Sequence, residues 1–339
     1  MNELQHPDSI WTWSSSGRKS KASLWVPYLQ SISKVKGAKG TWEISFNGGE
    51  MRIDLNKVEV ILFYGASGEL PLTFLDDLAA RRIPALLHRR NLPDPYVFVP
   101  AGRRDDADIL SAQITVRNND IKSCFIARTL VRERFKATSF PIPEAYYKGL
   151  SQLRDVKDIR LMEAHQSKIY WDKYFAKLGQ PGISRRSSNP ISAALDAGSF
   201  FLYGIMLRWV LMHKMSPAHG FLHVTTGYPS LVYDLMEPYR YLIENAVAAC
   251  VRLQSKDLTA ASLEEIKTSL DEVVYVPSHR THVRRKNLLH GAVLSLRSYL
   301  LGETKRLVLP TEGEKIGGRL PKMSYKLPGA EAKKKVVPG

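Results

Sequence analysis

The hydrophobic pattern of this 339-residue chain changes its period near residue 108, and that change constrains the fold more than any other feature. Before it, short runs alternate apolar and polar residues, as half-buried strands do. After it, apolar residues recur every three to four positions, as they do along one face of a helix. We therefore predict a multidomain α+β protein, with a small N-terminal β-rich domain followed by a larger all-α domain.

The N-terminal region carries specific strand and turn signals. Thr41–Leu55 contains two alternating runs around Asn47-Gly48-Gly49, which predicts a hairpin. Val58–Tyr64 and Pro84–His88 are short apolar runs typical of strands, with a short helix predicted over Leu72–Arg82 between them. Prolines and a glycine then accumulate, so we predict an N-terminal domain at residues 1–91 and a linker at residues 92–107.

The rest of the chain reads as helices followed by a tail. Helical spacing begins at about Asp108 and continues over Ala145–Leu153, Val156–Leu178, Ile191–Lys214, Leu231–Leu253, Leu263–Val273 and Val283–Leu301. The stretch Ala193–Met212 is long enough to cross a bilayer, but it contains Asp196 and Arg208, so a helix buried in a protein core is the better interpretation and no membrane association is expected. The predicted helical domain spans residues 108–309, and residues 310–339, rich in Gly, Pro and Lys, are predicted to be a basic disordered tail.

The charge of the chain points to a polyanionic partner. Lys and Arg number 49 against 33 Asp and Glu, a formal net charge of +16. Such a surplus solubilises a surface, or it binds nucleic acid or an anionic membrane surface. Cys124 and Cys250 form neither a zinc pattern nor a disulfide framework, which favours a cytoplasmic location. No phosphate-binding Gly-Lys-Ser/Thr loop occurs, which argues against nucleotide hydrolysis.

Metal-compatible side chains gather in the helical region. His223 lies in a loop-like segment, and Ser230 is predicted to cap the following helix. Asp234 and Glu237 are three residues apart on that helix, and Pro238 is expected to kink it. An imidazole with two carboxylates suits Mn²⁺ or Mg²⁺, but a solvent-exposed loop and helix face could contain the same residues without binding a metal.

A further carboxylate, Glu163, extends the pattern. It stands on a predicted helix, two turns before Tyr170 on the same face. The alternative is an ordinary salt bridge to Lys168 or Arg160 on that helix.

Four ordered blocks in the helical region resemble a known family, the CRISPR-associated integrase of spacer acquisition, which is the larger of the two core adaptation proteins. The blocks are Glu163-Ala-His-Gln-Ser-Lys-Ile-Tyr170-Trp171, Asn189-Pro-Ile-Ser-Ala-Ala-Leu-Asp-Ala-Gly198, Gly220-Phe-Leu-His223 and Ser230-Leu-Val-Tyr-Asp234-Leu-Met-Glu237-Pro-Tyr-Arg240. They span the predicted helical domain from about residue 110 to 305. The resemblance departs from the family at Ala164, His165, Asp196 and Ser199, none of which is an expected ligand.

The resemblance implies a site, a reaction and partners. Glu163, His223 and Glu237 are expected to hold Mg²⁺ or Mn²⁺, with Asp234 as a second acid close to the metal. The expected reaction is transesterification, in which the 3′-hydroxyl of a short prespacer duplex attacks a phosphodiester of a CRISPR repeat; with water as nucleophile the same site acts as an endonuclease. The expected partners are double-stranded DNA, a second copy of the chain joined through the β domains, and a small adaptation protein that bridges two dimers.

Several side chains are candidates for DNA contact. Basic residues form groups at Arg185-Arg186, at His279–Lys286 with Arg284 and Arg285, and at Lys333–Lys335, and Arg240 ends the last block. Tyr170 and Trp171 have the chemistry to stack on a DNA end. His219 and His165 are either packing residues or proton carriers near the site.

Three alternatives remain open on the sequence. A transposon-encoded integrase of the same superfamily has the same chemistry in another genetic setting. A DNA-binding subunit with an inactive site is disfavoured by the intact Glu163, His223 and Glu237. An unrelated basic metallohydrolase requires the four ordered blocks to be coincidence.

Overall fold

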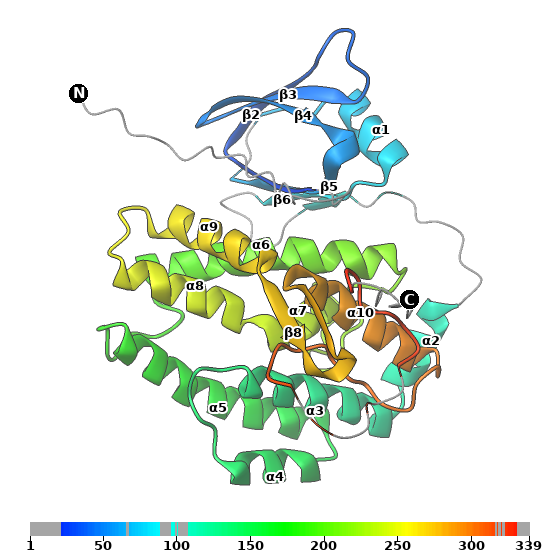
Figure 1. The fold of residues 1–339 in the computed structure, drawn as a ribbon, viewed down its shortest axis with the longest axis vertical. Coiled ribbons are helices and arrows are strands. Elements are labelled where there is room, and N and C mark those ends of the chain that lie inside the picture. The colour runs from blue at the N-terminus through cyan, green and yellow to red at the C-terminus, as the bar shows by residue number, and fades with distance from the viewer. Residues whose placement is uncertain are drawn as a thin grey trace, which may run out of the picture. The chain divides into compact units, whose positions relative to one another are not determined.

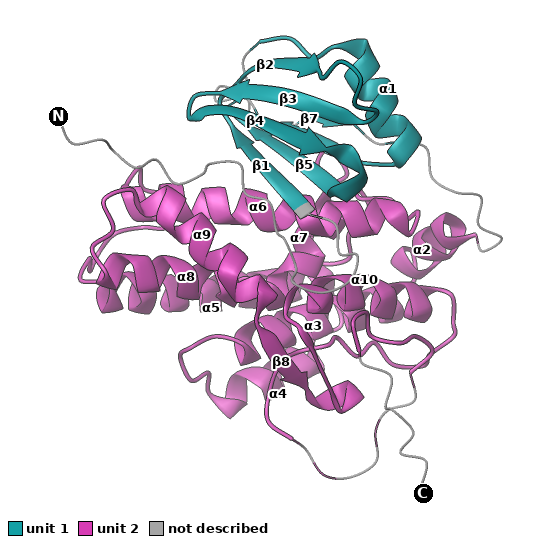
Figure 2. Ribbon diagram, turned by 45° about the horizontal axis from the view of Figure 1, so that its top comes forward, with its two compact units in different colours: residues 1–105 teal, residues 106–339 magenta. Residues whose placement is uncertain are grey.

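The computed structural model describes residues 22–65, 68–88, 96–98, 100, 108–315, 317, 320 and 323–330. The chain divides into two compact units, residues 1–105 and 106–339 (Figure 2). The first is β-rich and the second is mainly helical, so the predicted α+β class is confirmed.

Two sheets and one helix make up the N-terminal unit. Its described elements are β1 (Ala22–Pro27), β2 (Leu29–Lys34), β3 (Thr41–Phe46), β4 (Gly49–Asp54), β5 (Val58–Tyr64), α1 (Leu72–Arg81), β6 (Ala85–His88) and β7 (Tyr96–Phe98). One sheet has the order β1-β5-β6-β7, parallel except for the antiparallel β7, and the other is the antiparallel meander β2-β3-β4. The hairpin predicted around Asn47-Gly48-Gly49 is the β3–β4 turn.

Aromatic packing joins these sheets through α1. Phe74 of α1 is fully buried and lies with its ring centroid 5.0 Å from Trp42 of β3 and 6.4 Å from Phe63 of β5. The Trp42 indole N–H donates to Asp77 of α1 at 3.0 Å, which satisfies its polar atom. One helix therefore closes the core of the whole unit.

The N-terminal unit extends further than predicted. β7 pairs with β6, so the boundary set at residue 91 is too early, and the first compact unit continues to Asp105. The other residues of the predicted linker at 92–107, apart from residue 100, lie outside the described residues.

Helices dominate the second unit (Figure 1). They are α2 (Ile109–Arg117), α3 (Asp120–Lys136), α4 (Glu144–Gln152), α5 (Val156–Lys177), α6 (Pro190–Met212), α7 (Ser230–Met236), η2 (Glu237–Tyr239), α8 (Tyr241–Arg252), α9 (Leu258–Asp271) and α10 (Lys286–Leu300). α7 lies between two groups of helices, α6, α8 and α9 on one side and α3, α4 and α5 on the other. The short central α7 is therefore surrounded by longer helices.

The apolar helix α6 is mainly a core element. Among the described residues it is the one helix that is long and apolar enough to span a bilayer, and 72% of its apolar window is buried inside the fold. Its Gly198 lies so close to α8 and α9 that an added Cβ would stand 2.6 Å from Ile243 and 2.8 Å from Ile266. Burial in protein accounts for its composition, as predicted from Asp196 and Arg208.

Two predictions for this unit are corrected. The unit is not all-α, because Val273–Val276 (β8) and Thr281–Arg284 (β9) form a hairpin where the sequence pattern predicted only helix ends. Described parts of residues 310–330 pack on the unit rather than forming a disordered tail. Leu327 is 3% exposed, the Tyr239 hydroxyl donates to the Pro310 carbonyl at 2.8 Å, and Glu312 pairs with Arg285.

Candidate active site

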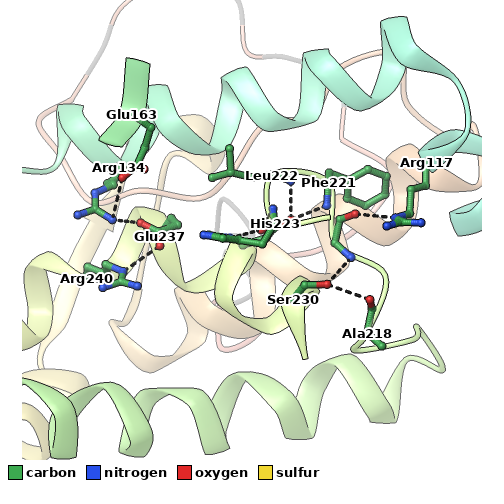
Figure 3. Close-up of polar contacts among 12 residues, drawn as sticks. Arg117, Arg134, Glu163, Ala218, Phe221, Leu222, His223, Ser230, Glu237 and Arg240 are labelled. Atoms are coloured by element: carbon green, nitrogen blue, oxygen red, sulfur yellow. Dashed lines mark hydrogen bonds and ion pairs between the residues drawn. The ribbon is translucent and has the colours of Figure 1, made fainter. Parts of the chain in front are cut away.

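Asp234 organises the loop that carries Phe221, Leu222 and His223, the three loop residues labelled in Figure 3. Its Oδ2 accepts the backbone N–H groups of Phe221 at 2.5 Å and Leu222 at 2.9 Å. Its Oδ1 accepts the His223 backbone N–H at 2.9 Å and lies 2.7 Å from His223 Nδ1. The carboxylate is fully buried, so these four contacts replace its hydration.

The loop needs a glycine at position 220. A Cβ there would stand 2.6 Å from the His223 carbonyl oxygen and 2.8 Å from Asp234 Oδ2. Real Cβ atoms do not approach backbone so closely, so any side chain would push the loop away from Asp234.

The helix that follows begins and ends differently from the prediction. Ser230 is the first residue of α7 and not its cap; its hydroxyl accepts Gly220 N–H and donates to the Ala218 carbonyl, both at 2.9 Å. The kink predicted at Pro238 is a break, since α7 ends at Met236 and the 3₁₀ turn η2 follows. Glu237 therefore stands at the junction of the two elements.

Two residues of α2 that the sequence did not single out hold this loop from the other side. The buried Gln113 amide donates to the carbonyls of Ser216 at 3.0 Å and His219 at 2.8 Å, and accepts the Ser216 N–H at 2.8 Å. Arg117 donates to the carbonyls of Gly220 at 3.0 Å and Val224 at 2.6 Å. Gln113, a polar residue on the apolar face of the predicted helix, was the feature of the sequence that could have indicated this role.

The Asp234 contact fixes the tautomer of His223. A carboxylate only accepts, so Nδ1 carries the proton and donates it, which leaves Nε2 with its lone pair for another partner. Burial by itself lowers the pKa of His223, but the hydrogen bond and charge of Asp234 raise it above its ordinary value. Histidines that bind a metal through one ring nitrogen usually donate the N–H of the other nitrogen to a carboxylate or carbonyl in this way.

Glu237 and Glu163 are joined by Arg134 of α3 (Figure 3). The Arg134 guanidinium pairs closely with Glu237 Oε2 and lies 3.7 Å from Glu163 Oε1. Arg240 donates to the other Glu237 oxygen at 3.0 Å. Burial opposes ionisation of Glu237, yet Arg134 and Arg240 lower its pKa to about 2. Neither Lys168 nor Arg160, the partners considered from the sequence, forms an ion pair with Glu163.

Glu244 of α8 lies behind these groups. The Tyr170 hydroxyl donates to its Oε2 at 2.5 Å, and the Tyr174 hydroxyl donates to its backbone carbonyl at 2.8 Å. Burial raises the pKa of Glu244, although Arg134 opposes the shift. Tyr170 is only 2% exposed, so the prediction that it contacts DNA is wrong; its ring is part of the core.

Two openings adjoin these residues. One, of about 320 Å³, is lined by Glu163, His223 and the basic side chains Lys157 and Arg160. A larger cleft of about 750 Å³ is lined by Trp171, Arg185, Arg186, Ser187, Ser188, Asn189, Ser192, Ala193, Asp196 and Arg240. Arg240, which binds Glu237, lines this cleft, so three of the predicted basic residues meet the partly exposed Trp171 there.

The other basic candidates are engaged within the protein. Arg285 donates to Glu272 at 2.6 Å, to Ser269 Oγ at 2.7 Å and to Glu312 at 2.9 Å, so its predicted phosphate contact does not fit its geometry. Arg284 lies 3.2 Å from Asp271. Lys333–Lys335 lie outside the described residues.

The two remaining histidines take ordinary positions. His219 Nδ1 lies 2.6 Å from the Ser216 hydroxyl, within the loop that Gln113 holds. His165 is exposed on α5. His219 is thus part of the packing of the loop.

The predicted ligand residues have the donor atoms that a divalent cation needs, although their side chains do not yet converge on one point. Among the described residues, no three His, Cys, Asp or Glu side chains are gathered closely enough for that. His223 offers Nε2, and Glu163 and Glu237 offer carboxylate oxygens around one shared cation, Arg134. An imidazole and two carboxylates are donors that Mn²⁺ and Mg²⁺ accept.

These features define a class: an α+β chain whose helical unit holds a His–Asp pair beside two arginine-bridged carboxylates and a basic cleft. Residues 142–272 match the family described as CRISPR associated protein Cas1. The predicted resemblance is thereby confirmed, and this part of the helical unit is similar to the Cas1 family.

Relatives and solved structures agree with this assignment. The chain is 32% identical over 101 residues to "CRISPR-associated endonuclease Cas1 2" of Pyrobaculum aerophilum, and 32% identical over 130 residues to the protein so named in Thermus thermophilus. These matches cover 30% and 36% of this chain, and 34% and 36% of the relatives' own length.

Similarity of fold extends over most of the chain. A casposase bound to integration product superposes with a TM-score of 0.74 at 17% identity, covering 87% of this chain and 96% of the casposase. A Cas1 protein from Thermotoga maritima superposes with a TM-score of 0.69 at 17% identity, covering 86% of this chain and 99% of that protein.

Proposed function

We propose that the protein is a metal-dependent DNA integrase and endonuclease that inserts short duplexes into a CRISPR repeat array. One observation carries the proposal: the Asp234-held His223 and Glu163 line one opening, and Arg134 bridges Glu163 to Glu237. The sequence blocks predicted the same three ligands.

Glu163, His223 and Glu237 would hold Mn²⁺ or Mg²⁺. When bound, such an ion lowers the pKa of an attacking hydroxyl and stabilises the charge that develops on the phosphate. Asp234 would act indirectly, because its hydrogen bonds within the described part of the chain go to the loop and to His223. His223 must be neutral to serve as a ligand.

The proposed reaction exchanges one phosphodiester for another. The 3′-oxygen of the incoming strand forms a bond to a phosphorus of the repeat, the existing bond from that phosphorus to its own 3′-oxygen breaks, and the proton of the attacking hydroxyl ends on the departing oxygen by way of solvent. No net energy source is needed, in keeping with the missing nucleotide-binding loop. With water as the nucleophile the same exchange is hydrolysis.

The cleft beside Arg240 suits a DNA strand. Arg186 is exposed there, has no side-chain hydrogen bond or ion pair among the described residues, and is free to meet a phosphate. Trp171 offers a face for a base, with Arg185 already stacked 5.5 Å from its ring. This cleft replaces Tyr170, Arg284 and Arg285 as the proposed DNA contact.

The proposed partners remain DNA, a second copy of the chain and a small adaptation protein. Structures of similar fold include a complex of TtCas1 with DNA and a Cas6-RT-Cas1–Cas2 complex. These complexes support the proposal by analogy of fold.

An integration assay tests the function. Labelled duplex with free 3′-hydroxyl ends is incubated with a supercoiled repeat-containing plasmid in Mn²⁺ or in EDTA. Joined product should form in Mn²⁺ and be lost in EDTA and in His223→Ala. His165→Ala, an exposed histidine of the same unit, is the matched control and should retain joining. Joining that persists in EDTA or in His223→Ala would refute the proposal.

A transposon-type integrase is the second candidate, favoured by the similarity of fold to the casposase. The same assay separates the two with a plasmid that lacks repeats. A CRISPR integrase should join at the repeat edge, whereas a transposon-type enzyme should insert without regard to the repeat.

A further inference from the structure

Arg134 is a buried cation placed among carboxylates. Its side chain is 5% exposed, whereas those of its neighbours Arg132 and Lys136 on the same helix, α3, are 42% and 55% exposed. Burying a guanidinium is unfavourable unless anions and hydrogen bonds replace its water. The carboxylates around it are therefore the reason that it can be buried.

Three glutamates surround Arg134. It pairs with Glu237, lies 3.7 Å from Glu163, and is close enough to Glu244 to interact electrostatically. Glu163 and Glu237 are the two proposed metal ligands, whereas Glu244 is not one. Glu244 accepts a side-chain hydrogen bond only from Tyr170 among the described residues, so it can accept another donor.

A divalent cation and this guanidinium would compete for the same oxygens. Glu237 Oε2 faces Arg134 and Oε1 faces Arg240, so both oxygens of this carboxylate already face a positive charge. A dication bound to Glu237 and Glu163 would stand a few ångströms from the guanidinium, and like charges at that distance repel each other.

We propose that Arg134 is an exchangeable internal cation, which bridges Glu163 and Glu237 until a divalent metal takes these carboxylates and its guanidinium then turns to Glu244. This inference rests on the proposed metal site. It adds two roles. Before metal binds, Arg134 keeps the two carboxylates close together, and its move to Glu244 then sets how tightly the site binds metal.

Mn²⁺ affinity, measured by isothermal titration calorimetry on the whole protein, tests the exchange. Arg134→Gln removes the competing charge, so Mn²⁺ should bind on the order of tenfold more tightly than in the wild type. In EDTA the same variant should melt at a lower temperature, and Mn²⁺ should raise its melting temperature more than it raises that of the wild type. Arg132→Gln, on the same helix but exposed, is the matched control and should change neither.

Glu244→Gln tests the second half of the exchange. Without the Glu244 carboxylate, the Arg134 guanidinium has no second anion to pair with when metal binds, so Mn²⁺ should bind more weakly than in the wild type. In the Arg134→Gln background the same change should have little effect, because no guanidinium remains to be relocated.

The possible results distinguish a failure of the proposed exchange from a failure of the proposed metal site. If the wild type binds no Mn²⁺, the metal site and the exchange both fail. If the wild type binds Mn²⁺ and Arg134→Gln binds it equally or less tightly, only the exchange fails, and Arg134 instead positions the ligands. If Arg134→Gln does not fold even with Mn²⁺, Arg134→Lys replaces it; a single ammonium bridges two carboxylates less well, so tighter binding than in the wild type is again required.

Discussion

At the scale of single residues, Asp234 is a positioning group. Two oxygens accept three backbone N–H groups and one imidazole N–H, and the side chain is fully buried. Its sequence position suggested a metal contact, but its hydrogen bonds are directed to the loop. The acid that organises the ligand is thus distinct from the acids that would bind the metal.

Asp234→Asn should loosen the His223 loop. An amide nitrogen would face N–H donors in place of an acceptor oxygen, which we expect to cost about 2–4 kcal/mol in the free energy of unfolding. Mn²⁺ affinity should fall about 10–100-fold, because the imidazole loses its orientation. Urea unfolding and calorimetry measure the two effects. Asp158→Asn, exposed on α5, is the control, and an equal loss there would contradict this role.

Gly220 gives a second prediction at this scale. Gly220→Ala should destabilise the protein by about 1–3 kcal/mol, because its Cβ would meet the His223 backbone and Asp234. Gly227→Ala is a matched control in the same loop, where a Cβ meets nothing within 4 Å. Thermal unfolding of both variants decides the point, and equal melting temperatures would refute the argument.

At the scale of elements, α2 fixes the loop that carries His223. Gln113 makes three hydrogen bonds to the segment 216–219 from a fully buried position. These bonds join segments about 100 residues apart in the chain, so the loop depends on the packing of α2.

Gln113→Leu should therefore raise loop mobility. The change leaves buried backbone groups of Ser216 and His219 without partners, which costs about 2–4 kcal/mol. Amide hydrogen exchange of residues 216–224 should accelerate, while exchange in α8 changes less. Thr115→Ala, exposed on α2, serves as the control. Unchanged exchange in the loop would show that α2 does not hold it.

The contact between α6 and α10 should be sensitive to acid. His290 of α10 stacks on Trp209 with ring centroids 3.5 Å apart, and its Nε2 lies 2.9 Å from His213 Nε2. Burial, with smaller contributions from His213 and Arg208, lowers the pKa of His290 to about 3. The neutral ring is thus the form that the folded protein favours.

The sign of the effect follows from this depressed pKa. The unfolded chain takes up the proton near pH 6.5 and the folded protein only near pH 3, so stability is full above pH 6.5 and is lost as the pH falls toward 3. At pH 4 we expect a loss of about 2–3 kcal/mol from this residue. Denaturant unfolding across this range measures it. His290→Gln should flatten the curve, whereas exposed His282→Gln should not; identical curves for wild type and His290→Gln would contradict the assignment.

At the scale of the whole molecule, the net charge of +16 should dominate the proposed DNA binding. Phosphate contacts release counterions, so the affinity for a non-specific duplex should fall by about 10³-fold or more between 50 and 200 mM salt. Fluorescence anisotropy across this range measures the slope. Arg186→Ala should make it shallower by about one unit, whereas Arg285→Ala, whose charge is internally paired, should not. Affinity independent of salt would exclude this mode of binding.

The sequence by itself determined the class of fold and the family. Strand and helix periods, and a glycine turn, depend on local geometry, so β3, β4, β5, α1, β6 and the long helices were predicted close to their observed bounds. The strands β1, β2 and β7 and the β8–β9 hairpin were missed, because short strands are stabilised by their partner strands rather than by their own pattern. The four ordered blocks identified the proposed ligands only by resemblance.

Only the tertiary structure decided how the candidate site is held. Arg134 joins Glu163 and Glu237, and Gln113 holds the His223 loop, through contacts between residues 29 to 106 positions apart in the chain. No local pattern shows which buried cation will meet which carboxylate, because burial and pairing are set by the whole fold. For the same reason only the structure showed that, of the two aromatic candidates for DNA contact, Tyr170 lies in the core and Trp171 lines the cleft.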